Sequence, residues 1–259
     1  MKNIFSLIVN VPFSESFFQN FLLFIKWLNH RKLSNNFYIT ERIRPKKLSQ
    51  VKNLVEDNSE DVAILIRGSI LFSDQFTFNT IDFYRQYYPD AIIYLSTWDN
   101  YESDLIRYQR DKNIKIVTSK FIKPKKGQNS TNLQIKGNLQ ALKKIKEDRI
   151  KFTLTTRSDQ RFYQTGILKF LKILHKQYKY KKYNNEDKQL SRLIGLSFNT
   201  FLYRVYGLND MFLFGLTDDV YNYWDSSFES RIFSDEKKYK KYSMLSYSKE
   251  RVNEVYFMS

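Results

Sequence analysis

Four short apolar runs recur in the middle of the chain, separated by longer amphipathic stretches. The runs are VAILIRGS (62–69), AIIYLSTW (91–98), IKIVTS (114–119) and KFTLTT (151–156). Continuous apolar runs of this length are typical of strands that are covered on both faces. They predict four buried strands.

The stretches between these runs have helical spacing. Residues 76–88, 101–112 and 133–146 fill the three gaps, and the apolar residues of the third drift around one helix face. An order of strand, helix, strand that repeats three times favours a parallel sheet with right-handed crossovers. The predicted fold class is therefore α/β, with a parallel sheet flanked by helices.

The pattern becomes more helical after residue 161. We expect helices over 166–178 and 187–207, a short strand over 210–215, and a helix within 216–225 that Thr217 caps. The predicted C-terminal part is thus richer in helix than the part before it.

These elements predict three parts of the chain. An α/β domain spans 61–226, an N-terminal extension (1–60) packs on it, and a basic, tyrosine-rich tail follows (227–259). The extension has the pattern of an edge strand over 4–11 and a helix over 15–30.

Composition limits the chemistry. The net charge of +16 comes from 43 Lys and Arg against 27 Asp and Glu. A charge of this sign favours anionic partners such as nucleic acid, acidic membrane leaflets or nucleotide phosphates. Biased codon usage gives a similar excess of lysine. Cysteine is absent, which excludes disulfides, thiolate zinc sites and cysteine nucleophiles. Only two histidines, His30 and His175, are present, which argues against a histidine metal site or a catalytic triad.

Three stretches interleave lysine with aromatic residues: KFIKPKKG (120–127), KQYKYKKY (176–183) and KKYKKY (237–242). This pattern suits single-stranded nucleic acid, an anionic membrane surface, or simply a solvated basic face.

The N-terminus lacks the arrangement of a signal peptide, and its apolar stretches are shorter than the ~20 residues of a spanning helix. We expect a soluble, cytoplasmic protein.

Polar residues gather where the predicted strands end. They are Arg67 to Ser69, Ser96 to Asp99, Ser119, and Thr156 to Asp159. Ligands of parallel sheets bind at the carboxyl ends of the strands, so this edge is the candidate site. Asp159 suits a divalent cation or a sugar hydroxyl, or else caps a helix or turn. Arg157 and Arg161 favour an anionic ligand, because one carboxylate does not neutralise both.

A second group of carboxylates surrounds the strand expected over 210–215. Asp210, Asp218 and Asp219 either cap a helix and a turn or supply a general base, provided that the fold brings them opposite residues 157–159. Gly68 stands alone, without the glycine pattern of a dinucleotide site or a P-loop.

The order of these motifs resembles the WavE lipopolysaccharide synthesis family, bacterial glycosyltransferases of lipopolysaccharide and capsule gene clusters. The matching elements are IRGSI (66–70), STW (96–98), NLQI (132–135), TTRSD (155–159) and DMFLFG (210–215). Together they cover about residues 62–226. Ser69 stands where the family has proline, and Thr155 where it has lysine.

The resemblance implies a GT-A-like glycosyltransferase with a Rossmann-type, mostly parallel sheet, which moves a sugar from a nucleotide-sugar donor to a saccharide or lipid-linked saccharide acceptor. The partners expected from it are the donor, the acceptor and the surface of the inner membrane, and nucleic acid is not among them. The residues expected on the donor side are Gly68, Ser69, Thr97, Asp99, Asn132, Gln134, Asn138, Arg157 and Asp159. Asp210 and Asp219 are the candidates for the acceptor proton.

The resemblance also bears on a metal cofactor. The fourth strand of GT-A enzymes commonly ends in a D-x-D motif that binds Mn²⁺ or Mg²⁺, and here Arg157 replaces its first aspartate while Asp159 remains as the metal ligand. A guanidinium neutralises a diphosphate by itself, so the need for a metal stays open. The alternatives are a non-catalytic, basic nucleic-acid-binding protein and an inactive relative that keeps the fold.

Overall fold

The computed structural model describes residues 59–108, 111–124, 130–182, 188–196, 208 and 210–230, together with Phe24, Ser243 and Ser246. Its sheet and the helices that connect the strands belong to one compact unit, Lys46–Ser259. The strand expected over 4–11 lies outside the described residues, as does the helix expected over 15–30 except for Phe24, which is helical.

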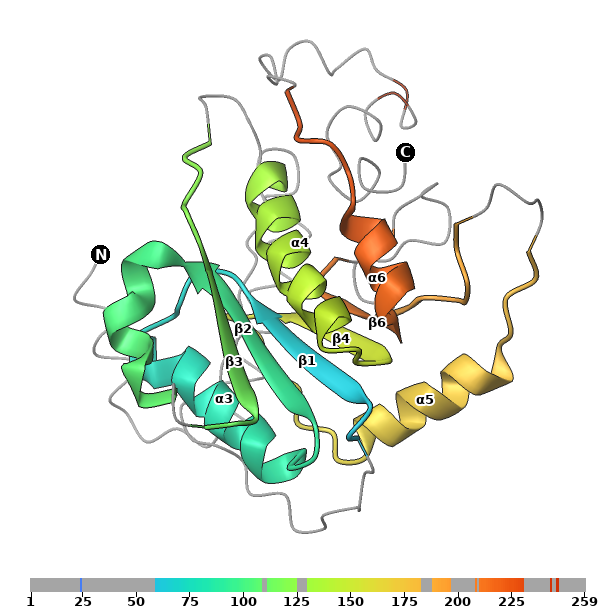
Figure 1. The fold of residues 1–259 in the computed structure, drawn as a ribbon, viewed down its shortest axis with the longest axis horizontal. Helices are drawn as coiled ribbons and strands as arrows, with labels where there is room; N and C mark the ends of the chain where they lie inside the picture. Colours follow the sequence, from blue (N-terminus) through green and yellow to red (C-terminus); the bar gives the residue numbers. More distant parts are fainter. Residues whose placement is uncertain are drawn as a thin grey trace. The chain divides into compact units, whose positions relative to one another are not determined.

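A six-stranded sheet in the order β3-β2-β1-β4-β6-β5 forms the centre of the described structure (Figure 1). Its strands are β1 (Val62–Arg67), β2 (Ile92–Trp98), β3 (Ile114–Ser119), β4 (Phe152–Arg157), β5 (Ile194–Gly195) and β6 (Phe212–Leu216). The first four are parallel to one another, β6 is antiparallel to β4, and β5 is antiparallel to β6. The prediction of a mostly parallel α/β sheet is confirmed, with strand bounds within a residue or two.

Helices connect the strands. They are the 3-10 turn η1 (Ser73–Gln75), α3 (Phe76–Tyr87), the 3-10 segment η2 (Asp99–Tyr108), α4 (Thr131–Glu147), α5 (Ile167–Gln177) and α6 (Thr217–Trp224). The crossover from β2 to β3, expected as an α-helix, is thus a 3-10 segment. Within the described residues no helix has both the length and the apolar character that a membrane span requires.

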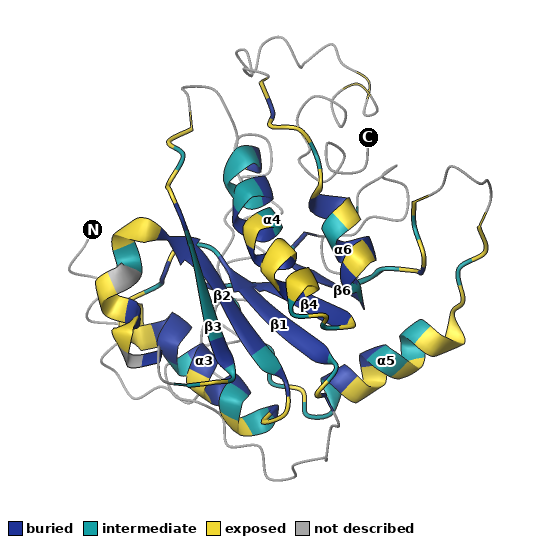
Figure 2. Cartoon of the chain, viewed as in Figure 1, coloured by how far each residue is buried: buried dark blue, intermediate teal, exposed yellow. Residues whose placement is uncertain are grey.

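Alternate residues of each strand supply two cores on opposite faces of the sheet. Ile64 and Leu154 pack in a cluster with residues of α3 and α5, whereas Ala63 and Leu65 pack with residues of α4 and α6. All six residues of β1 are buried, which Figure 2 shows as a continuous dark strand. Helices on both faces explain why the sequence has unbroken apolar runs here.

Two expectations for the C-terminal part are wrong. Residues 188–196, expected to be helical, contain β5 and no helix, because the segment pairs with β6 and the Asp219 carboxylate binds its backbone. The rest of the expected helix, 197–207, lies outside the described residues. Thr217 is the first residue of α6 and not its cap, because its Oγ1 donates to the Ile150 carbonyl at 2.7 Å.

Candidate functional site

The site begins where two neighbouring parallel strands end together. Arg67 and Arg157, the last residues of β1 and β4, are register partners, and the Ser158 amide still donates to the Arg67 carbonyl at 2.8 Å. On its other side β1 pairs with β2, whose connection leads away from β4. The gap between β1 and β4 is therefore the point where the strand order reverses, at which doubly wound sheets bind ligands.

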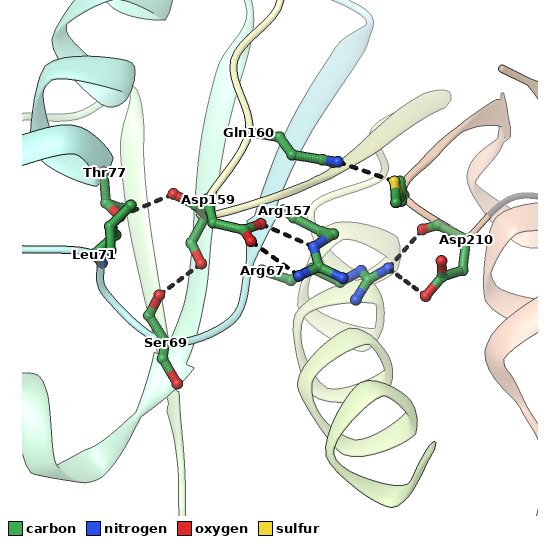
Figure 3. Close-up of polar contacts among 10 residues, drawn as sticks. Arg67, Ser69, Leu71, Thr77, Arg157, Asp159, Gln160 and Asp210 are labelled. Carbon is green, nitrogen blue, oxygen red and sulfur yellow. Dashed lines mark hydrogen bonds and ion pairs between the residues drawn. The ribbon is translucent and has the colours of Figure 1, made fainter. Parts of the chain in front are cut away.

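The turn after β1 is pressed against the turn after β4. Gly68 has a φ of 121°, and a Cβ atom added there would lie 2.8 Å from Ser158 Oγ. Ser158 Oγ donates to the Ser69 carbonyl at 2.6 Å (Figure 3). A left-handed backbone without space for a side chain requires glycine at position 68.

Thr77, at the start of α3, joins the same two turns. Its buried hydroxyl accepts a bond from the Leu71 amide and donates to the Ser158 carbonyl, both at 2.9 Å (Figure 3). No local pattern indicates this threonine, since its partners are 6 and 81 residues away.

A buried ion pair lies beneath the edge. Arg67 Nη2 donates to the Asp210 carbonyl at 2.5 Å and lies 3.4 Å from its carboxylate, and the guanidinium is 4.8 Å from the centre of the Trp224 ring. The Arg67 side chain is only 6% exposed, and this burial, assisted by the charge of Arg157, lowers the pKa of Arg67, whereas Asp210 opposes the shift. The pair anchors the start of β6 to the end of β1.

A second ion pair lies closer to solvent. Arg157 binds Asp159 through Nε to Oδ1 at 2.8 Å and Nη2 to Oδ2 at 3.0 Å, and the side chains are 29% and 20% exposed. These hydrogen bonds raise the pKa of Arg157, and the charge of Asp210 adds to the effect. Figure 3 shows the two guanidinium groups side by side between Asp159 and Asp210.

Asp159, the predicted metal ligand, is engaged by an arginine in the described structure. Both carboxylate oxygens of Asp159 accept bonds from Arg157. No group of three His, Cys, Asp or Glu side chains suited to a metal occurs in the described part of the chain. Asp159 is not a helix cap either, since α5 begins at Ile167 after Gly166.

Arg161 does not belong to the site. Its guanidinium donates to Thr80 Oγ1 at 2.8 Å and to the Phe76 carbonyl at 2.9 Å, and it lies 4.5 Å from the centre of the Phe76 ring. Arg161 therefore fastens the chain after β4 to α3, and the support for an anionic ligand at this edge comes from Arg157.

Two of the three donor-side candidates on α4 offer buried acceptors. Asn138 Nδ2 donates to the Gln134 carbonyl at 2.8 Å, while Asn138 Oδ1 and Gln134 Oε1 are buried and have no hydrogen-bond partner among the described residues. Asn132 instead binds the Glu229 backbone twice, at 2.9 and 2.6 Å. Asn132 thus holds the chain beyond α6, and the other two amides have capacity for a ligand.

The candidates after β1 and β2 lie in different surroundings. Trp98 Nε1 donates to Ser69 Oγ at 3.0 Å, which joins the two strand ends. Thr97 is buried, and within the described part of the chain its Oγ1 has no hydrogen-bond partner. Asp99 is exposed at the start of η2.

The two acceptor-side candidates are at opposite ends of the sheet. Asp210 precedes β6 near the end of β4, where Thr156 pairs with Phe212. Asp219 follows β6 near the start of β4, where Phe152 pairs with Leu216. The structure therefore brings Asp210, and not Asp219, to residues 157–159.

Asp219 has a structural position at its own edge. Its carboxylate accepts bonds from the Leu190 amide at 2.6 Å, the Ser191 amide at 2.8 Å and Ser191 Oγ at 2.6 Å. Arg67 is the site residue for which the sequence predicted a place at this edge but no role. Its only sequence signal is a charge at the end of an apolar strand.

The fold and this edge define the class: an α/β protein whose switch point carries two arginine–aspartate pairs. No model of a known protein family matches the sequence, and no curated protein matches it at a significant level.

Proposed function

We propose that this protein is a glycosyltransferase with a GT-A-like sheet, which moves a sugar from a nucleotide-sugar donor to a saccharide acceptor in lipopolysaccharide or capsule synthesis. The observation that carries the proposal is the convergence of Arg67, Arg157, Asp159 and Asp210 at the switch point. The motif order that resembles the WavE family supports it, because three of its elements end at this edge.

Arg157 has the position and chemistry to bind the donor diphosphate. Its bonds to Asp159 use two of the five guanidinium donors, and the side chain is partly exposed. Forked guanidinium donors suit phosphate oxygens, and a fixed positive charge stabilises the leaving nucleoside diphosphate. In this role Asp159 is a positioning residue that fixes the plane of the fork.

Asp210 is the proposed general base for the acceptor hydroxyl. It is held by Arg67 from below, and its charge acts on both arginines. A base must lie within hydrogen-bond reach of the proton that it removes, and Asp210 is at the edge where the donor sugar would lie. Asp219, at the opposite edge, has no part in this proposal.

The remaining polar groups suit the nucleoside and sugar hydroxyls. Gln134 Oε1, Asn138 Oδ1 and Thr97 Oγ1 are buried, and no residue that the structure describes forms a hydrogen bond with them. A buried polar atom without a partner costs free energy, which a ligand hydroxyl recovers. Arg157 binds both oxygens of Asp159, and in this proposal its guanidinium takes the place of a cation at the diphosphate.

A thermal-shift panel of nucleotide sugars, with manganese or with EDTA, tests the proposal. The correct donor is expected to raise the melting temperature, since a ligand at about 100 times its Kd stabilises by ~2.7 kcal/mol. Arg157→Ala should abolish the shift, whereas Arg192→Ala, which removes an exposed arginine on the segment that pairs with β6, should retain it.

Other outcomes would contradict the proposal. Stabilisation that disappears with EDTA would overturn the cation-free site. If no nucleotide sugar stabilises the protein while single-stranded nucleic acid binds with a steep salt dependence, the protein belongs to the nucleic-acid-binding class.

A further inference from the structure

Helix α5 presents apolar side chains to solvent. Leu168 and Leu171 are buried against the core, while Phe170 and Ile173, on the outer side, are 56% and 53% exposed. Tyr178, directly after the helix, is 58% exposed. Large exposed apolar side chains that gather on one helix mark an interaction surface.

Lysines flank these apolar side chains. Lys169 and Lys176 are exposed on α5, and Lys179, Lys181 and Lys182 are exposed in the chain that follows. Residues 160–182 contain six lysines, one arginine and no acidic residue. At 100° per residue, Lys169 and Lys176 lie beside Ile173 on the helix surface. One side of α5 therefore combines an apolar stripe with a basic stripe.

We propose that this surface, formed by Lys169, Phe170, Ile173, Lys176 and Tyr178, docks on an anionic lipid bilayer. An amphipathic helix with lysines beside Phe or Leu side chains lies in the membrane interface, with its apolar side chains among the acyl chains and its lysines at the headgroups. The lysine stems reach past the apolar stripe to the phosphates.

Two other occupants fit the surface less well. A second copy of the chain would bring like charges together, which opposes association. Single-stranded nucleic acid uses aromatic stacking and phosphate contacts, and it leaves the aliphatic Ile173 without a role. The bilayer satisfies the apolar and the basic side chains together.

The docking surface lies away from the switch point. Lys172 of α5 binds Asp61, just before β1, at 2.9 Å, and His175 packs against Phe152 at the start of β4 with ring centres 5.2 Å apart. Both contacts are at the amino ends of the strands. The inference therefore does not rest on the proposed function, and a docked protein keeps its candidate site accessible.

Co-sedimentation of the full chain with vesicles tests this inference. We expect binding to vesicles that contain phosphatidylglycerol, weak binding to phosphatidylcholine alone, and weaker binding as salt is raised. Lys176→Glu should reduce the affinity at least about fivefold, the contribution of one lysine near a charged membrane. Ile173→Ser should reduce it roughly tenfold through lost apolar burial.

Matched variants on other elements control for charge and polarity. Lys143→Glu on α4 makes the same charge change at an exposed lysine, and Ile106→Ser on η2 makes the same polarity change at a residue that is 61% exposed. Both should bind vesicles like the wild type. Circular dichroism checks that all four variants fold.

Three results would overturn the docking surface. The first is equal binding to neutral and anionic vesicles. The second is vesicle binding that Lys176→Glu and Ile173→Ser leave unchanged. The third is an absence of vesicle binding, together with a dimer or a nucleic-acid complex that these two changes disrupt. The Arg157→Ala variant separates the two proposals, because it should lose donor binding and keep vesicle binding.

Discussion

At the scale of single residues, the Arg157–Asp159 pair explains why a strand ends in a charge cluster. Two residues apart on a tight turn, the side chains form a fork with two bonds, which orders a guanidinium that would otherwise move freely. The neighbouring Arg67–Asp210 pair is buried and serves as its support. A positively charged group is thus held in one orientation at the protein surface.

Changing the partner of Arg157 tests this positioning role. Asp159→Asn keeps the size of the side chain but removes the charge, so the fork loses its fixed orientation. We expect the Kd for the donor to rise about tenfold, which corresponds to ~1.4 kcal/mol, with little change in the melting temperature. Isothermal titration calorimetry measures the affinity. Arg157→Lys is the companion variant, because a lysine has one ammonium where the fork has several donors; unchanged affinity in both variants would refute the role.

At the scale of elements, strand positions followed from the sequence because the strands are buried on both faces and therefore continuously apolar. The segment 188–196 was not predictable in the same way. Its conformation depends on the Asp219 carboxylate, 28 and 29 residues further along, and on pairing with β6. The Arg67–Asp210 pair joins residues 143 apart, and no local pattern indicates it. Tertiary contacts override local propensity at both places.

Gly68, in the turn between β1 and η1, and Gly137, in α4, should respond differently to a change to alanine. Gly68→Ala places a Cβ 2.8 Å from Ser158 Oγ at a φ of 121°, and strain of this kind costs about 1–3 kcal/mol. Gly137→Ala in α4 places its Cβ at an ordinary 3.8 Å from Trp98 and should stabilise by roughly 0.5–1 kcal/mol through helix propensity. Urea unfolding measures both changes. A Gly68→Ala protein as stable as the wild type would refute the tight turn.

The contact between α5 and the segment before β5 predicts a pH dependence. His175 Nε2 lies 2.7 Å from Ser191 Oγ, and burial together with the charge of Lys151 lowers the pKa of His175 from 6.5, against the opposing charge of Asp219. A histidine with a lowered pKa in the folded state stabilises the protein above pH 6.5, and this contribution is lost as the pH falls, because the unfolded chain binds the proton more tightly.

The melting temperature measured from about pH 7.5 to about pH 5.5, the range in which histidine titrates, reports this contribution. The wild type should lose more stability over this range than His175→Gln, whose side chain carries no titrating proton. Equal losses in the two proteins would show that His175 does not contribute.

At the scale of the whole molecule, strand order decides which aspartate takes part in the chemistry. The sequence placed Asp210 and Asp219 on either side of one short strand and so could not separate them. Because β6 runs antiparallel to β4, its start lies at the carboxyl edge and its end at the amino edge. A reversal of one strand therefore divides two residues nine positions apart between two ends of the sheet.

This division predicts that the same Asp→Asn substitution lowers stability at one aspartate and the rate of sugar transfer at the other. Asp219→Asn removes the charge that holds Leu190 and Ser191, so the melting temperature should fall, since hydrogen bonds to a charged group each contribute about 1.5–3 kcal/mol. Below that temperature the rate of sugar transfer should equal that of the wild type. Asp210→Asn should keep donor binding but reduce the transfer rate by roughly 100-fold or more, as expected for the loss of a general base. Transfer assays with labelled donor measure the rates, and a greater loss of transfer in Asp219→Asn than in Asp210→Asn would contradict the assignment of the two edges.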